Sequence, residues 1–244
     1  MTQIIKNLLA LTIAVVGVHA VYIGYIRPEA AVIVEAARLA GQSTPRDIVV
    51  ILKDFEQEIC LIFMVWGVFL IVGKCMAILK HQYLFRVDFL EGSNADGDDL
   101  DSVLAALEEL PQAIRDTPLL RTLAASLRRY VITRDVQDTS DAIETSIEAL
   151  AMRQEAENSM VRYLIWAIPS IGFIGTVRGI GQALSMADEA LAGNIAGMTE
   201  SLGIAFNSTL VALLISIGLM FLLHQLQRLQ DGLVFETQAY CESF

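Results

Sequence analysis

The residues that could do chemistry in this chain are hydroxyl and small residues in two apolar stretches of its C-terminal half. In the first stretch such residues recur every three or four positions, at Gly172, Thr176, Gly179 and Ala183. In the second, Ser201, Ala205, Ser208, Ala212 and Ser216 recur in the same way, with Asn207 and Thr209 beside them. Residues at this spacing share one face of a helix. In lipid, small residues let helix backbones approach closely and hydroxyls supply hydrogen bonds, so both faces predict helix packing.

Groups that carry protons or bind metals are scarce in the apolar stretches. A proton relay across a membrane normally needs an intramembrane carboxylate or histidine. The nearest carboxylates lie at or beyond the ends of the stretches, at Glu56, Glu58, Asp188, Glu189 and Glu200. His19 is the one titratable candidate at mid-depth, and a single imidazole is more often a packing donor. We therefore predict no metal site, no cofactor and no enzymatic activity, since neither ligand spacing nor a nucleophile–base arrangement is found.

The composition is that of a membrane protein, in which ionisable side chains are few. Hydrophobic residues make up 55% of the 244, the mean hydropathy is +0.54, and only 18% of residues are charged. Four apolar runs approach the roughly 20 residues that cross about 30 Å of hydrocarbon. They are Leu8–Ile26, Ile59–Leu79, Tyr163–Ala187 and Leu202–Leu223. The sequence predicts an all-α, polytopic membrane protein with four transmembrane helices, embedded in a lipid bilayer.

The first run has a competing interpretation. Lys6, the apolar stretch and the small residue Ala20 resemble a signal peptide with its cleavage site. The apolar run continues to Ile26, however, and Tyr22 and Tyr25 are placed as an interfacial belt would place them. We favour an uncleaved span.

Lysine and arginine positions predict the orientation, because cytoplasmic flanks collect positive charge. Most of them flank one side of the predicted spans, whereas residues 188–200 carry three carboxylates and no Lys or Arg. Both termini are then cytoplasmic, and residues 27–58 and 188–201 lie outside. The net charge of −11 gives no basic footprint for nucleic acid, so we predict no nucleic-acid partner.

The chain divides into four predicted parts. Residues 1–79 form a hairpin of two spans whose external loop, 27–58, holds helices at 28–40 and 47–58 joined by a turn at 41–45. Residues 80–160 form a cytoplasmic helical insert, 161–225 form the third and fourth spans, and 226–244 form a cytoplasmic tail. The second span should continue as a helix to about Phe89, and one helix should run from Asp138 into the third span. Apolar stripes in the insert predict a bundle that packs on these extended membrane helices.

Two motifs resemble a known family. The segment I-P-S-I-G-F-I-G-T-V-R-G-I, Ile168 to Ile180, is similar to the third-helix signature of the MotA/TolQ/ExbB family, in which a proline opens the helix and G-x-x-G-T-V-x-G follows. The stretch S-L-G-I-A-F-N-S-T-L-V-A-L-L is similar to that family's last helix. Together the motifs cover roughly residues 163–225.

The resemblance implies a subunit of an ion-driven rotary motor in the bacterial inner membrane. Five copies would surround a dimer of a single-span partner of the ExbD, TolR or MotB kind, whose aspartate takes the ion, H⁺ or Na⁺. Thr176 and Thr209 would face the central pore, with Ser208 and Asn207 in the same pathway. The residues that would shape and pack the pore helix are Pro169, Gly172, Gly175, Gly179 and Ala183.

The role of Arg178, the branch of the family and the function each have two interpretations. Relatives often place an apolar or aromatic residue where Arg178 stands, and an acidic residue near Ile204. Arg178 either snorkels toward the outer interface or forms an ion pair with Glu200 or Asp188 of a neighbouring subunit. Four spans resemble the flagellar branch, whereas G-T-V-x-G resembles the TolQ and ExbB branch. The alternative function is a non-motor membrane scaffold held together by small-residue helix packing.

Overall fold

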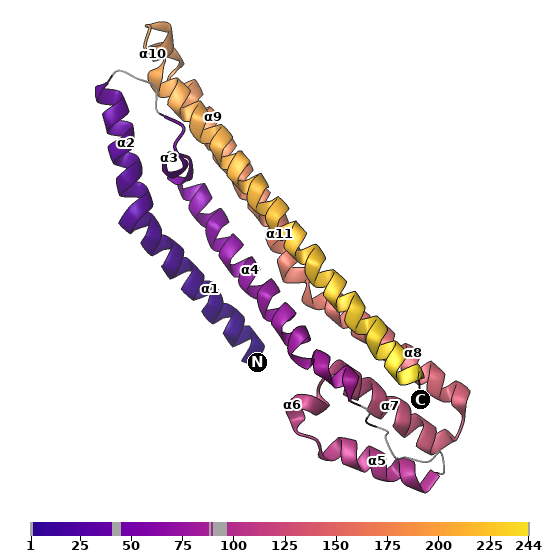
Figure 1. The fold of residues 1–244 in the computed structure, drawn as a ribbon. Helices are drawn as coiled ribbons and strands as arrows, with labels where there is room; N and C mark the ends of the chain where they lie inside the picture. The colour runs from indigo at the N-terminus through magenta and orange to yellow at the C-terminus, as the bar shows by residue number, and fades with distance from the viewer. Residues whose placement is uncertain (1, 41–44, 88, 90–96, 244) are drawn as a thin grey trace. The chain divides into compact units, whose positions relative to one another are not determined.

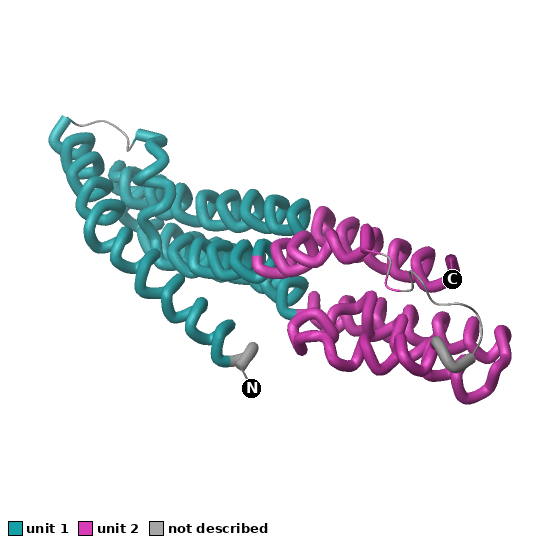
Figure 2. Tube along the Cα trace, turned by 60° about the horizontal axis from the view of Figure 1, so that its bottom comes forward, with its two compact units in different colours: residues 1–72, 160–223 teal, residues 73–159, 224–244 magenta. Residues whose placement is uncertain are grey.

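The computed structural model describes residues 2–40, 45–87, 89 and 97–243. Over these residues the chain forms helices, turns and bends and no strand, which confirms the all-α prediction (Figure 1). It splits into two compact units (Figure 2). Unit 1 contains Met1–Val72 and Met160–Leu223, and unit 2 contains Gly73–Ser159 and His224–Phe244.

Four helical stretches are long and apolar enough to cross a membrane, as predicted. Among the described residues they are Ile5–Leu39, Phe55–Arg86, Val136–Ser185 and Ala196–Glu242. Three of the stretches contain a whole predicted run, and the third ends at Ser185, two residues before the predicted end of the run Tyr163–Ala187.

The first span is longer than predicted. Helix α1 (Thr2–Val21) continues through the π-helical turn η1 (Tyr22–Ile26) into α2 (Arg27–Leu39), so residues 28–40 are not a separate helix. Pro28 has no N–H and its ring crowds the carbonyl four residues earlier, which would break a regular α-helix. The wider π turn, in which the Arg27 N–H bonds to the Tyr22 carbonyl, accommodates the proline.

The predicted helix over 47–58 is also wrong in its extent. Asp47 caps the short helix α3 (Ile48–Leu52) by accepting from the Val49 N–H at 2.8 Å. The second spanning helix, α4 (Phe55–His81), begins already at Phe55. The predicted turn at 41–45 lies outside the described residues except for Pro45.

The remaining helices of unit 1 come from the C-terminal half. Helix α9 (Ser159–Ser185) is followed by α10 (Ala187–Leu191) and by α11 (Ala196–Glu242). Helix α11 continues well beyond the predicted end of the fourth span at Leu223, and its residues from 224 onward belong to unit 2.

Unit 2 has its own apolar core. It is built by α5 (Gly97–Glu109), α6 (Gln112–Arg115), α7 (Pro118–Thr133) and α8 (Val136–Glu157), together with the ends of α4 and α11. The predicted stripes supply this core, which includes Leu100, Leu107, Leu119, Leu123, Leu127, Ile143 and Ile147. The helix of the second span ends at His81, not near Phe89, and a 3-10 turn, η2 (Gln82–Arg86), follows it.

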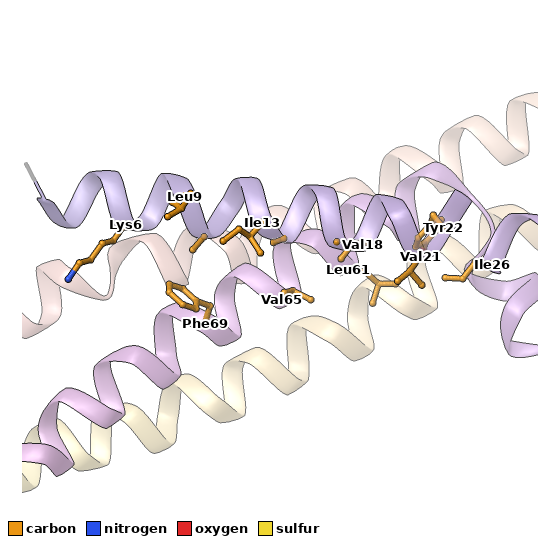
Figure 3. Close-up of a pocket in the computed structure, with 13 residues that line it drawn as sticks. Lys6, Leu9, Ile13, Val18, Val21, Tyr22, Ile26, Leu61, Val65 and Phe69 are labelled. Atoms are coloured by element: carbon orange, nitrogen blue, oxygen red, sulfur yellow. The ribbon is translucent and has the colours of Figure 1, made fainter. Parts of the chain in front are cut away.

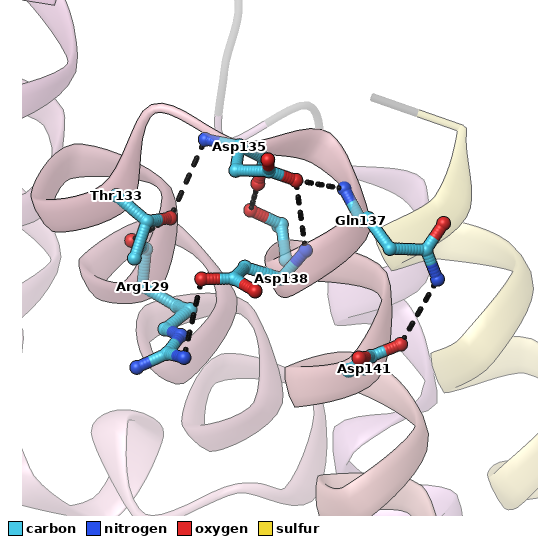
Figure 4. A network of polar contacts seen from close by, with 7 residues as sticks. Arg129, Thr133, Asp135, Gln137, Asp138 and Asp141 are labelled. Atoms are coloured by element: carbon cyan, nitrogen blue, oxygen red, sulfur yellow. Dashed lines mark hydrogen bonds and ion pairs between the residues drawn. The ribbon is translucent and has the colours of Figure 1, made fainter.

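Capping fixes the boundaries of α7 and α8. Arg134 adopts the left-handed conformation with φ of 54° and ends α7. Asp135 then accepts from the Gln137 and Asp138 N–H groups at 2.7 and 3.2 Å and starts α8 (Figure 4). The sequence predicts one unbroken helix from Asp138 into the third span, but this helix is interrupted at Asn158. The buried side-chain amide of Asn158 donates to Gln230 Oε1 at 2.7 Å.

Candidate functional site

The small-residue faces predicted from the sequence lie against each other between α9 and α11. Gly172, Gly175, Gly179 and Ala183 of α9 are all buried. A Cβ atom at Gly179 would lie 2.7 Å from the Ala205 amide nitrogen and 2.8 Å from the Ser201 carbonyl oxygen. At Gly175 it would lie 2.5 Å from Ser208 Cβ. Only glycine permits this approach, so the glycines set the distance between the two helices.

Thr176 and Thr209 meet across this interface. Their hydroxyl oxygens are in hydrogen-bonding contact with each other. The Thr176 hydroxyl is also 3.0 Å from the Ala205 carbonyl oxygen, and the Thr209 hydroxyl is 3.3 Å from the Gly172 carbonyl oxygen. A hydroxyl has one proton and two lone pairs, so the pair retains acceptor capacity after both protons are donated. Both side chains are half-buried, and this arrangement can solvate a cation or accept from a protonated carboxyl group.

The other predicted pathway residues lie differently. Ser208 is buried, donates to the Ile204 carbonyl at 2.9 Å, and has Gln57 Nε2 of α4 at 3.4 Å. It thus belongs to the packing between α4 and α11. Asn207 and Pro169 are both half-buried.

Arg178 has a partner that the sequence did not reveal. Its Nε and one terminal nitrogen lie 2.7 and 2.8 Å from the two carboxylate oxygens of Glu56 on α4. Glu56 is buried, and its Cγ lies 3.2 Å from the position that a Cβ of Gly175 would take. Within the chain, Glu200 contacts Lys53 at 3.2 Å instead of Arg178. The pair between Arg178 and Glu200 of neighbouring subunits stays a prediction.

A second buried carboxylate lies two residues further along α4. Glu58 Oε1 is 2.5 Å from His19 Nδ1 of α1, and its Oε2 is 2.6 Å from a terminal nitrogen of Arg27. Glu56 and Glu58 are therefore buried in the helical packing of unit 1, and both lie in the first turn of α4, at the end of the span where the sequence places them. The sequence shows two glutamates, two arginines and a histidine in or beside the apolar runs, where each buried charge needs a partner, but it does not show which of them meet.

Comparison with known proteins places the chain in a family. No curated protein and no solved structure matches it. The family model described as the MotA/TolQ/ExbB proton channel family matches residues 114–239. These residues are just over half of the chain, and they include Thr176 and Thr209. The chain thus belongs to the MotA/TolQ/ExbB proton channel family.

Proposed function

We propose that this protein is the channel-forming subunit of an ion-driven rotary motor in a bacterial inner membrane. Its family and its four apolar helices support a multi-pass subunit of a proton channel. The observation that carries the proposal is the contact between Thr176 and Thr209, which places two hydroxyls together on the two helices that bear the family motifs. A proton or a sodium ion is the coupling ion.

The ion-carrying carboxylate comes from a partner protein in this proposal. Within the described part of the spans, Glu56 and Glu58 are both held by cationic or imidazole groups, so neither is available as a carrier. Five copies of the chain surround a dimer of single-span partner helices, each with an aspartate. The threonine pair solvates the ion or hydrogen-bonds to that aspartate as it passes.

Charge distribution supports the orientation. Both termini, residues 80–160 and the tail are cytoplasmic in this arrangement, because the flanking lysines and arginines gather on that side. Each charge that crosses supplies about 2.3 kcal/mol per 100 mV, so mechanical work proceeds in small steps.

Replacing the hydroxyls tests the proposal. We expect Thr176→Val and Thr209→Val each to reduce proton or sodium flux strongly in vesicles that contain the chain and its partner, without loss of assembly. Thr12→Val is the matched control, because Thr12 is exposed on α1 and its hydroxyl bonds only to its own helix, to the Leu8 carbonyl at 3.0 Å. Full ion-coupled activity in both pore variants would instead favour the scaffold function.

A further inference from the structure

An apolar groove runs along the face of unit 1 that is formed by α1 and α4. Its volume is about 600 Å³, and it opens to the surroundings along its length. Side chains of α1 and α4 line it, with Lys6 at one end of the row and Ile26 at the other (Figure 3). Among the described residues that line it, Lys6 alone is charged.

The groove has the length of a membrane. At 1.5 Å per residue, the helix from Lys6 to Ile26 is roughly 30 Å long, which equals the thickness of the hydrocarbon core. Lys6 lies one residue inside the first spanning stretch, which begins at Ile5. Its ammonium group is therefore at the depth where lipid headgroups begin, and its side chain is exposed.

The volume of the groove is too small to enclose a whole helix. A helix with its side chains is about 10–12 Å wide, so a segment laid along the roughly 18 Å from Lys6 to Val18 would fill on the order of 1,400 Å³. The groove holds less than half of that volume. An acyl chain is a single file of methylene groups and fits such a narrow apolar channel.

We propose that this groove binds one anionic phospholipid, whose phosphate contacts Lys6 and whose acyl chain lies between α1 and α4. A chain of one leaflet covers about half of the 30 Å core, so it extends from Lys6 to the vicinity of Gly17. A Cβ atom at Gly17 would meet no atom within 4 Å, which leaves room there for the end of the chain. The site is separate from the threonine pair and does not depend on ion conduction.

Two variants and two matched controls test the site. Full-length protein in detergent is titrated with phosphatidylglycerol or with phosphatidylcholine, and bound lipid is counted by native mass spectrometry. Lys6→Gln should weaken phosphatidylglycerol binding about fivefold, because one lysine near an anionic headgroup raises the affinity by about this factor. Phosphatidylcholine binding should change little. Gly17→Leu should weaken binding of both lipids, since the leucine leans toward the N-terminal half of the groove.

The controls change the same residue types outside the groove. Lys80→Gln removes another exposed lysine, and Gly24→Leu fills another position where a Cβ would meet nothing within 4 Å. Both should bind phosphatidylglycerol as the unmodified protein does. Equal affinity for the two lipids with no effect of Lys6→Gln would overturn the proposal. So would a change of oligomeric mass in Gly17→Leu, which would assign the groove to a second copy of the chain.

Discussion

Arg178 on α9 is joined to Glu56 on α4 by two hydrogen bonds of 2.7 and 2.8 Å, although 122 residues separate them in the chain. The two partners are unequally buried, since 39% of the Arg178 side chain is exposed and only 6% of the Glu56 side chain. The pair connects α4 to the family motif on α9, two residues from Thr176. It explains why an arginine is tolerated in the middle of an otherwise apolar and small-residue segment.

Unequal burial predicts unequal costs of breaking this pair. Arg178→Leu leaves the buried Glu56 carboxylate without a partner and should destabilise the protein by about 2–4 kcal/mol. Glu56→Gln leaves a partly exposed guanidinium and should cost less than half as much. Thermal melting in detergent measures both, and the double variant should recover part of the loss.

The exposed pair of Lys53 and Glu200 is the control for this comparison. Lys53→Gln should change stability by no more than about 1 kcal/mol, because 43% of the Glu200 side chain is exposed. If Arg178→Leu proves as mild as Lys53→Gln, the Glu56 pair has no structural role.

Close helix contact predicts which glycines tolerate a methyl group. Gly179→Ala would bring a Cβ within 2.8 Å of backbone atoms of α11, which cannot yield by a side-chain rotation. We expect it to destabilise the protein by about 1–3 kcal/mol and to weaken ion flux. Gly181→Ala on the same helix meets nothing within 4 Å and should be neutral. Equal behaviour of the two variants would contradict the packing of α9 on α11.

Both the spans and the small-residue faces could be predicted from the sequence, because apolar length and three- to four-residue spacing are local properties. The burial of Glu56 and Glu58 could not. A carboxylate beside an apolar run is normally assigned to the headgroup region, and only the positions of Arg178, Arg27 and His19 on other helices make burial tolerable. The break at Asn158 could not be predicted for the same reason, since its partner Gln230 lies 72 residues away.

The threonine hydroxyls should act as a unit. Because Thr176 and Thr209 contact each other, either valine variant removes the hydrogen bond between them. The double variant should therefore lower ion flux no further than the more damaging single variant. Thr176→Ser retains the hydroxyl and should keep most of the flux. If the double variant instead lowers ion flux by the product of the two single-variant factors, the two residues act independently, at separate steps.

The buried carboxylate of Glu58 should depend more on Arg27 than on His19. It contacts both His19 and Arg27, so His19→Ala leaves the carboxylate with the arginine at 2.6 Å. Arg27→Ala leaves it with an imidazole, and Glu58→Ala removes both contacts. We expect Arg27→Ala to lower the melting temperature more than His19→Ala, and Glu58→Ala to lower it less than Arg27→Ala, because Glu58→Ala leaves only partly exposed groups without a partner. A Glu58→Ala variant that melts like the unmodified protein would show that α1 is not held to α4 by these groups.

Asp54, just before α4, gives the fold a pH dependence of known sign. Burial raises the pKa of this carboxyl group, against the opposing effect of Lys53 and Arg178, and its Oδ2 has no hydrogen-bond partner among the described residues. The folded protein thus binds a proton here more readily than the unfolded chain does. Its contribution to stability is gained as the pH falls through the raised pKa toward the ordinary value of 3.8, and is lost as the pH rises. Asp54→Asn should raise the melting temperature at neutral pH. This gain in melting temperature over the unmodified protein should shrink on acidification. Asp188→Asn, at an exposed carboxylate on α10, is the control, and a lower neutral-pH melting temperature in Asp54→Asn would mean that the charged carboxylate is needed at the start of α4.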